Sequence, residues 1–410
     1  MKATWKKNKN LKPKVIFEKI DNLKTVVDGK VTFTGFEHRG AKVALETMID
    51  FPSICNDLDK ELILTKAFWE AAKSTPIEQN NFIDLINKNI KEALEKRDET
   101  YFLLTSLSVE EIGIRSLELN NCVIRFYKSS FPRKFKGRKE LIESKKKCKE
   151  SESIGYTKVV VELKAKSEYM AAKKALRALD LLRSMFNLFS NSKSEFLGNE
   201  WQPINKIRSG EFHTIHNEIG EIFPDVFWFD PSYSSAMPYY CDQISITVKN
   251  VKFIINHLNK LNKQYKSIII DGLLRYVRAF DEKDQNVAVM RAWSALESIA
   301  APNESNCDSV TRRCAFLFHE HEYHKQILEH LREYRNRNVH SGEESNKAKD
   351  HGFQIQFYFK ELVLFHMRNV GYFNDIFEAN KFLDLSTDEV TLTYNKKIVE
   401  RALKFRGYTA

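Results

Sequence analysis

The stretch LREYRNRNVHSG, at residues 331–342, contains side chains suited to chemistry at a phosphate. Arg335, Asn336 and His340 stand in the pattern R-N-x-x-x-H. A histidine with a pKa of about 6.5 transfers protons at neutral pH, and the planar fork of an arginine matches two phosphoryl oxygens. An asparagine can orient a ribose or the histidine itself. These three residue types therefore carry the functional groups for cleaving a phosphodiester without a metal.

A purely structural interpretation of the same residues is also open. Gly342 is expected to end a helix, and cations near a helix C-terminus complement the helix dipole, which stabilises the helix by about 1 kcal/mol. Arg335 and His340 are five positions apart, so they are rotated by about 140° around a helix and do not project in the same direction. One copy of the motif therefore makes a poor catalytic pocket.

Strand-like and helix-like segments alternate in the first part of the chain. Residues 25–33 are expected to form a hairpin with Asp28-Gly29 in its turn, and residues 121–127 and 156–163 two further strands. Ser167 is expected to cap a long helix. The apolar stripe of that helix consists of Ala172, Ala175, Leu179, Leu182, Phe186 and Phe189.

From about residue 245 the pattern changes to consecutive amphipathic helices, which indicate an antiparallel bundle. Residues 201–240, with four prolines, are expected to be a connecting region on the surface. The last thirty residues could hold a short strand and a final helix. Helices are expected at 258–280, at 284–301, from Asp308 or Ser309 through Phe318, at 325–340 and at 353–370.

The fold class that follows is α+β. A mixed α/β N-terminal region, residues 1–245, precedes a C-terminal antiparallel all-α helical bundle, residues 246–410. The 410 residues are too many for one ordinary core, and the apolar content of 42% is ample for burial. No apolar run of eighteen residues and no secretion signal is present, so we expect a cytoplasmic protein without membrane contact.

Positive charge is concentrated in one internal segment. The chain has a net charge of +10, and residues 133–149 hold nine basic and two acidic side chains. Such a concentration is typical of a surface that binds a polyanion, although a lysine-rich run can also be a solvated loop. Phe131 and Phe135 could offer stacking surfaces for bases. The residues expected to bind RNA are Lys134, Lys136, Arg138, Lys145, Lys146 and Lys147.

Other chemistries find little support in the sequence. The six cysteines include no CxxC pair, and no P-loop, GxGxxG, GxSxG or HExxH is present. His319, His321 and His324, in the string HEHEYH, are expected to lie in a polar turn and not to bind a metal. His213 and His216 are expected to be ordinary surface or packing histidines. We therefore expect neither a metal nor a cofactor.

Three segments in order carry a resemblance to a known family. They are AVMRAWSALESIA, which contains Glu297, then SVTRRCAFLF, then ILEHLREYRNRNVHSG. Together they resemble the HEPN superfamily of ribonucleases, and in particular Apea-like HEPN domains, over roughly residues 260–375. This resemblance does not extend to the first two hundred residues.

The resemblance implies a metal-independent endoribonuclease that leaves 2′,3′-cyclic phosphate ends. In the family two motifs face each other across a homodimer, and this arrangement would overcome the poor geometry of a single motif. Arg335, Asn336 and His340 would be catalytic, with Glu297 holding the Arg335 guanidinium in place.

The resemblance also implies a biological setting. The protein would act in bacterial anti-phage defence through abortive infection, or as a toxin. Residues 1–245 would sense a trigger or hold the nuclease off. Further partners would be a phage-derived trigger or an antitoxin. The alternative is a non-catalytic HEPN-like module that binds RNA or a protein.

Overall fold

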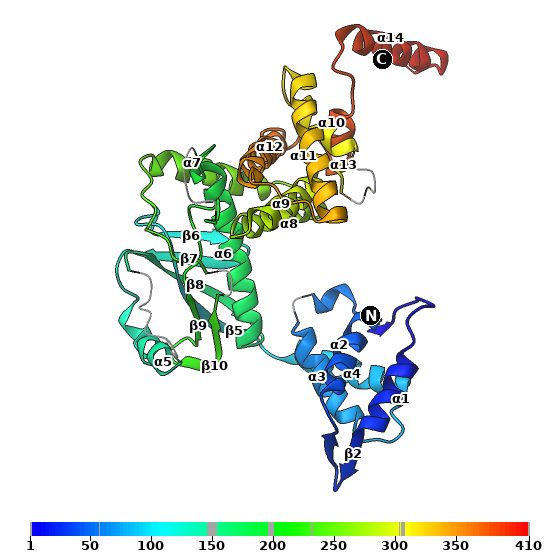
Figure 1. The fold of residues 1–410 in the computed structure, drawn as a ribbon, viewed down its shortest axis with the longest axis vertical. Helices are drawn as coiled ribbons and strands as arrows, with labels where there is room; N and C mark the ends of the chain where they lie inside the picture. Colours follow the sequence, from blue (N-terminus) through cyan, green and yellow to red (C-terminus); the bar gives the residue numbers. More distant parts are fainter. Residues whose placement is uncertain are drawn as a thin grey trace. The chain divides into compact units, whose positions relative to one another are not determined.

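The computed structural model describes residues 2–56, 58–145, 154–195, 201–230, 233–302, 304 and 308–408. The chain forms two compact units (Figure 1). The N-terminal unit comprises residues 1–101 and 163–174, and the main unit comprises residues 102–162 and 175–410. Mixed α and β structure with a helical C-terminal region confirms the expected α+β class at this level.

The N-terminal unit is mostly helical. Its helices are α1 (Pro13–Leu23), α2 (Glu37–Met48), α3 (Lys60–Ala71) and α4 (Gln79–Glu95), and its strands are β1 (Thr4–Trp5), β2 (Lys24–Val27), β3 (Lys30–Phe33) and β4 (Ile49–Asp50). The predicted hairpin is confirmed as β2 and β3. Asp28 and Gly29 in its turn have φ values of 49° and 71°, the left-handed values that a two-residue hairpin turn of this kind needs.

A six-stranded antiparallel sheet lies at the centre of the strand-rich part of the chain. In spatial order its strands are β10 (Ile222–Phe229), β9 (Phe212–His216), β5 (Glu99–Leu107), β8 (Thr157–Ala165), β7 (Cys122–Tyr127) and β6 (Ser116–Leu119). The strands predicted at 121–127 and 156–163 are thus confirmed as β7 and β8. The short elements η2 (Arg133–Phe135) and α5 (Gly137–Lys145) follow β7.

The prediction of a surface connection at 201–240 is wrong. This region supplies β9 and β10, and β9 lies inside the sheet between β10 and β5 with all five residues buried. The segment FHTIH was missed because two of its five residues are histidines, which weaken a strand pattern. Both imidazoles have hydrogen-bond partners inside the protein, and this allows their burial.

The long helix α6 (Glu168–Ser190) begins and packs as predicted. The Ser167 hydroxyl accepts a hydrogen bond from the Met170 backbone N–H at 3.3 Å, which satisfies one of the donors at the helix start. Phe189 is only partly buried. The fully buried members of the stripe are Ala172, Ala175, Leu179, Leu182 and Phe186.

Eight helices follow among the described residues, and they include every helix expected after residue 245. They are α7 (Ile244–Leu258), α8 (Lys263–Phe280), α9 (Gln285–Ala300), α10 (Asp308–Phe316), α11 (His321–Ser341), α12 (Ala348–Arg368), α13 (Ile376–Leu383) and α14 (Glu389–Phe405). α9 packs against α8, α10, α11 and α12 and is therefore the central helix.

Several boundaries in this region differ from the prediction, including the start of α12, which lies at Ala348 and not at residue 353. The helix predicted at 258–280 begins only at Lys263, because the Asn262 side chain accepts from the Tyr265 N–H and caps α8 there. α11 begins at His321, so two histidines of HEHEYH lie in a helix and not in a turn. The final residues form one helix, α14, without the short strand that we expected.

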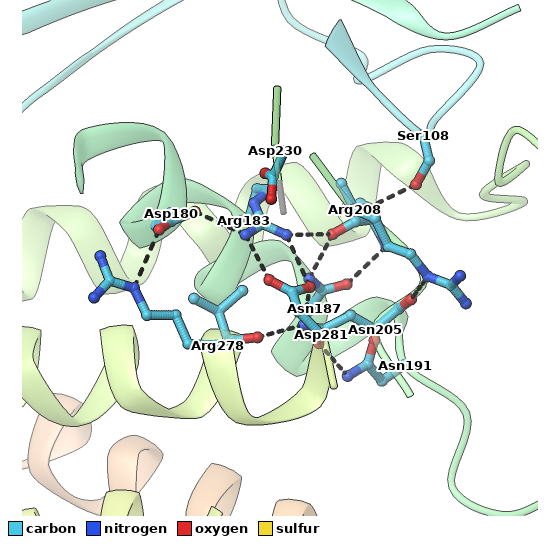
Figure 2. A network of polar contacts seen from close by, with 12 residues as sticks. Ser108, Asp180, Arg183, Asn187, Asn191, Asn205, Arg208, Asp230, Arg278 and Asp281 are labelled. Carbon is cyan, nitrogen blue, oxygen red and sulfur yellow. Dashed lines mark hydrogen bonds and ion pairs between the residues drawn. The ribbon is translucent and has the colours of Figure 1, made fainter. Parts of the chain in front are cut away.

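A buried polar network joins α6 to α8 inside the main unit (Figure 2). The guanidinium of Arg183 donates to Asp281 at 2.8 and 3.1 Å and to Asp180 at 2.7 Å. Asn205, on the segment before β9, donates to the same Asp281 at 2.8 Å. These contacts connect α6 to the helical bundle at the end of α8. The sheet and the bundle accordingly belong to one unit, and the functional division at residue 245 stays a prediction.

Among the residues that the structure describes, no helix has both the length and the apolar character that crossing a bilayer requires.

Candidate functional site

Helix α11 carries the R-N-x-x-x-H motif in its last two turns. The helix ends at Gly342, which has a φ of 67° and whose N–H donates to the Asn338 carbonyl at 3.0 Å. Glycine adopts this left-handed conformation without steric cost, so the predicted helix end is confirmed. His340 therefore lies in the final turn, one residue before the last helical position.

The Glu297 carboxylate on α9 lies next to the motif. Its Oε1 atom is 3.7 Å from Nη2 of Arg335 and accepts a hydrogen bond from the buried Trp293 indole at 2.8 Å. Glu297 and Arg335 are 24% and 27% exposed. The structure thus contains the expected pair of Glu297 and Arg335, and the indole fixes the carboxylate from the core side. The pair remains open to solvent on its other side.

Asn336 is the second polar contact of the Arg335 guanidinium. Nη1 of Arg335 donates to Oδ1 of Asn336 at 3.1 Å. A guanidinium has five N–H donors, and within the described residues these two contacts are its only polar ones. The remaining donors can bind an anion that approaches from solvent.

His340 is separated from this group. Its side chain is exposed, and among the described residues the imidazole has no hydrogen-bond or ion-pair partner. The helical rotation of about 140° between Arg335 and His340 turns the imidazole away from the guanidinium. The structure therefore brings Glu297, Arg335 and Asn336 together, and leaves His340 exposed at the helix end.

A cleft of about 420 Å³ between α8 and α9 lies on one side of Glu297. Arg275 crosses it, with Nε 2.7 Å from the Asp271 carboxylate and Nη1 3.1 Å from the Ser294 hydroxyl. Glu297 lines the same cleft. Charged groups of both signs and three serines therefore border the cleft that Glu297 lines.

The last turns of α11 are anchored by residues that the sequence did not reveal. The buried Tyr334 donates to Oδ1 of Asn286, which also accepts from the Ser345 N–H at 2.9 Å. Burial raises the pKa of the Tyr334 phenol. Tyr334 and the His351 ring lie 4.7 Å apart, and burial lowers the pKa of His351. Tyr334 faces the core, so the adjacent Arg335 is directed toward α9.

The basic stretch, residues 133–149, is only partly available to RNA. Lys134 places its ammonium 3.9 Å from the Phe102 ring centroid and donates to the Glu218 carbonyl at 3.2 Å. Arg138 is buried and donates to the Phe212 carbonyl at 3.0 Å, so it is a structural residue and not an exposed phosphate ligand. Lys136 is exposed. The side chain of Lys145, and Lys146 and Lys147, lie outside what the structure describes.

The suggestion that Phe131 and Phe135 stack with bases also needs correction. Phe135 is buried in a core cluster with Phe102, Leu104 and Val160. Phe131 packs at the edge of this cluster under the Arg138 guanidinium, which lies 4.8 Å from its ring centroid. The basic and aromatic residues of this stretch thus pack against one another through cation–π contacts.

Several histidines outside the motif have structural contacts. His324 stacks on Phe318 at 4.0 Å, and no group of three potential metal ligands occurs within the described part of the chain. His213 has the carboxylate partner that sequence spacing did not show, because its Nε2 lies 3.4 Å from Asp230. His216 is fully buried, and burial lowers its pKa to about 4.

Comparisons with protein-family models, with curated proteins and with solved structures find no match to this chain. The likeness to HEPN ribonucleases therefore remains a resemblance that rests on the motif and on the order of the helices around it.

Proposed function

We propose that this protein is a metal-independent endoribonuclease of the HEPN type that acts in bacterial anti-phage defence, through abortive infection or as a toxin. The observation that carries the proposal is the ion pair between Glu297 on α9 and Arg335 of the R-N-x-x-x-H motif on α11. It links two of the three segments that resemble the family. The exposed His340, at the end of the same helix, supplies an imidazole for proton transfer.

The chemistry requires a base, an acid and positive charge. A base removes the proton of a ribose 2′-OH, whose oxygen then attacks the adjacent phosphorus. An acid protonates the departing 5′-oxygen, so the products are a 2′,3′-cyclic phosphate and a 5′-hydroxyl. Arg335 would stabilise the additional negative charge on the phosphoryl oxygens, and Glu297 and Asn336 would hold its guanidinium in position.

A homodimer is part of the proposal because one chain separates the two essential groups. Two copies of α11 facing each other would place His340 of each protomer near the opposite Arg335, and the two imidazoles could serve as base and acid. The site in one chain is open and exposed at His340, as such an arrangement requires. Sedimentation equilibrium of the purified protein should therefore give twice the mass of the chain.

RNA would be bound mainly through its backbone. Lys136 is an exposed cation in the basic stretch, which also holds the lysines expected to contact RNA at 145–147. α5 packs against β10, whereas α11 packs against α9 and α10, so the basic stretch and the motif belong to different parts of the main unit. Contacts at the basic stretch would therefore affect affinity and not the position of cleavage.

A second candidate function is a non-catalytic module that binds RNA or a protein. One observation favours it: Glu297 and Asn336 already contact the Arg335 guanidinium, which suits a purely structural residue. Both candidate functions keep residues 1–245 as the region that would sense a trigger. Both also keep a phage-derived trigger or an antitoxin as a partner.

Incubation of the purified protein with labelled total RNA in EDTA distinguishes the two. A nuclease of this type should cleave under these conditions and leave 2′,3′-cyclic phosphates, which resist a phosphatase until acid opens them. Binding without cleavage, with or without a divalent metal, would support the non-catalytic module. Cleavage that needs a divalent metal would contradict both the mechanism and the absence of a cofactor.

A further inference from the structure

The main unit contains a cavity of about 550 Å³ that the proposed nuclease chemistry does not use. It lies between the C-terminal end of α6, the first half of α11 and the middle of α12. His324 lines it, and His340 is about 24 Å further along the axis of the same helix. Neither Glu297 nor Arg335 reaches the cavity. It is therefore a separate site.

Aromatic rings form one wall of this cavity. His324 stacks on Phe318 with ring centroids 4.0 Å apart, and Phe318 stacks on Phe357 at 5.3 Å, both with interplanar angles of 28°. The Tyr358 hydroxyl lies 3.0 Å from Nδ1 of His324 and holds this imidazole in place. Phe357 and Tyr323 are 43% and 61% exposed, although both line the cavity. Exposed ring faces of this kind suit a planar aromatic ligand.

Side-chain amides form the inner part of the cavity. Nδ2 of Asn191 lies 3.2 Å from Oε1 of Gln356 and 3.3 Å from the buried Tyr276 hydroxyl. Gln354 also lines the cavity, and its side chain interacts with the His351 imidazole. Amide groups are the usual partners of the donor and acceptor edges of nucleobases.

Two lysines place positive charge at the same cavity. The Lys360 ammonium lies 4.8 Å from the Phe189 ring centroid, and Lys193 is exposed nearby. Neither lysine has an ion pair within the described residues, although Asp350 and Glu361 also line the cavity. Burial lowers the pKa of the Lys360 ammonium, the charge of Glu361 opposes this, and the charge of Lys193 adds to it. Two cations that repel each other are favourably placed for an anion.

We propose that this cavity binds a phosphorylated nucleoside, with its base on the ring faces of Phe357 and Tyr323 and its phosphate between Lys193 and Lys360. Its volume falls within the range of small-molecule sites, roughly 300–1,000 Å³. A free nucleotide and one nucleotide of an RNA strand share this chemistry. The proposal does not depend on the nuclease activity, because none of its residues belongs to the R-N-x-x-x-H site.

Isothermal titration calorimetry of the full-length protein tests the site. The probes are adenosine, guanosine, cytidine and uridine monophosphates, the corresponding nucleosides, inorganic phosphate and a 5′-phosphorylated oligoribonucleotide. At least one nucleotide should bind about tenfold or more tightly than its nucleoside or inorganic phosphate. Saturation by a mononucleotide would identify a free ligand, and saturation by the oligonucleotide alone would identify a nucleotide within RNA.

Variants then locate the binding. Lys360→Gln and Phe357→Ala should each weaken binding of the favoured probe by about tenfold or more, since one removes a phosphate contact and the other a stacking surface. Lys347→Gln and Tyr372→Ala are matched controls, because both residues are exposed and outside the cavity, and they should bind as wild type does. Melting temperatures verify folding. Absence of binding by every probe at millimolar concentration, or equal binding by all four variants, would overturn the proposal.

Discussion

Glu297 is the residue on which the candidate site depends most. Its Oε1 atom receives both the Trp293 indole and the Arg335 guanidinium, so one carboxylate connects the core of the bundle with the motif. This geometry fixes the direction of the guanidinium without burying it. A change that keeps the shape of Glu297 and removes its charge therefore isolates the effect on Arg335.

Glu297→Gln should lower the RNA cleavage rate by about tenfold while its free energy of unfolding falls by only about 1 kcal/mol. The amide oxygen can still accept from Trp293, but it no longer attracts Arg335. Cleavage kinetics and urea denaturation of the same preparation measure both quantities. Glu333→Gln, at an exposed position of α11, is the matched control. An unchanged cleavage rate and an unchanged stability in Glu297→Gln would indicate a solvent-facing carboxylate without function.

The basic stretch contains one structural and one exposed cation that are two residues apart. Arg138→Ala should destabilise the protein by about 2 kcal/mol, because it removes a buried hydrogen bond and a cation–π contact. Lys136→Gln should leave stability unchanged, weaken RNA binding and reduce its log–log salt slope by about one unit. Filter binding across a salt series and denaturation curves separate the two effects. Normal stability of Arg138→Ala would refute its structural assignment.

At the scale of residues, the R-N-x-x-x-H motif and Glu297 could both be identified from the sequence, because both lie on helices with clear apolar patterns. It could not separate Arg138 from Lys136, since both are basic residues in one polar run. It also missed the contact of His213 with Asp230, which depends on how β9 and the chain after β10 come together. Residue identity predicts what a side chain can do, whereas its packing decides whether it is available.

The elements of the main unit are held together by the polar network of Figure 2. Arg183 on α6 is buried, and its pKa is raised because Asp281 and Asp180 outweigh the effect of burial. Asn205 completes the network by donating to the Val277 carbonyl at 2.7 Å as well as to Asp281. α6, the segment before β9 and the end of α8 thus meet at the Asp281 carboxylate.

Asp281→Asn should destabilise the protein by about 3 kcal/mol, because it leaves the buried Arg183 charge with only one carboxylate. The midpoint of urea denaturation, followed by circular dichroism, measures the change. Asp271→Asn is the control, since its pair with Arg275 is about half exposed and contributes less than about 1 kcal/mol. Equal stabilities of the two variants would show that the network does not hold α6 to α8.

At the scale of elements the sequence predicted helices better than strands. α9 was located correctly because Asp284 caps it and the stripe of Val289, Trp293 and Leu296 repeats along it. β9 was missed because its two buried histidines do not have the apolar alternation of a strand. Helical patterns are local, whereas the Thr105 hydroxyl that hydrogen-bonds with the buried His213 lies 108 positions away in the chain.

At the scale of the whole molecule the predicted boundary near residue 245 followed a change of local pattern. The compact units follow long-range contacts, which group most of the sheet with the bundle. Contacts such as that of Arg183 with Asp281 span 98 positions and have no signature in either segment. The α+β class could be predicted from pattern, but the grouping of the elements could not.

The stability of the whole molecule should depend on pH through its buried histidines. The pKa of His216 is lowered to about 4 and that of His366 to about 3, in both cases because burial disfavours the charged form. The unfolded chain binds these protons below a pH of about 6.5 and the folded protein does not. Stability is therefore full above about pH 6.5 and is lost as pH falls toward the folded pKa values.

Between about pH 7 and pH 5, His216 alone should reduce the free energy of unfolding by about 2 kcal/mol. Urea denaturation at several pH values measures the slope. The stability of His216→Gln should fall less steeply with pH than that of the wild type, by about one proton taken up on unfolding. His319→Gln, at an exposed position, should keep the wild-type slope. A stability that is constant over this range would contradict the burial of a neutral imidazole in β9.

The central claim is that the motif on α11 cleaves RNA, and the cleavage rate of four proteins tests it most directly. In EDTA, Arg335→Ala and His340→Ala should each cleave about 100-fold or more slowly than the wild type. The first variant lacks the positive charge that stabilises the phosphoryl oxygens, and the second lacks the imidazole that transfers protons. Arg337→Ala, an exposed arginine of the same helix that pairs with Glu343, should retain the wild-type rate. Equal rates in all four proteins would contradict the claim.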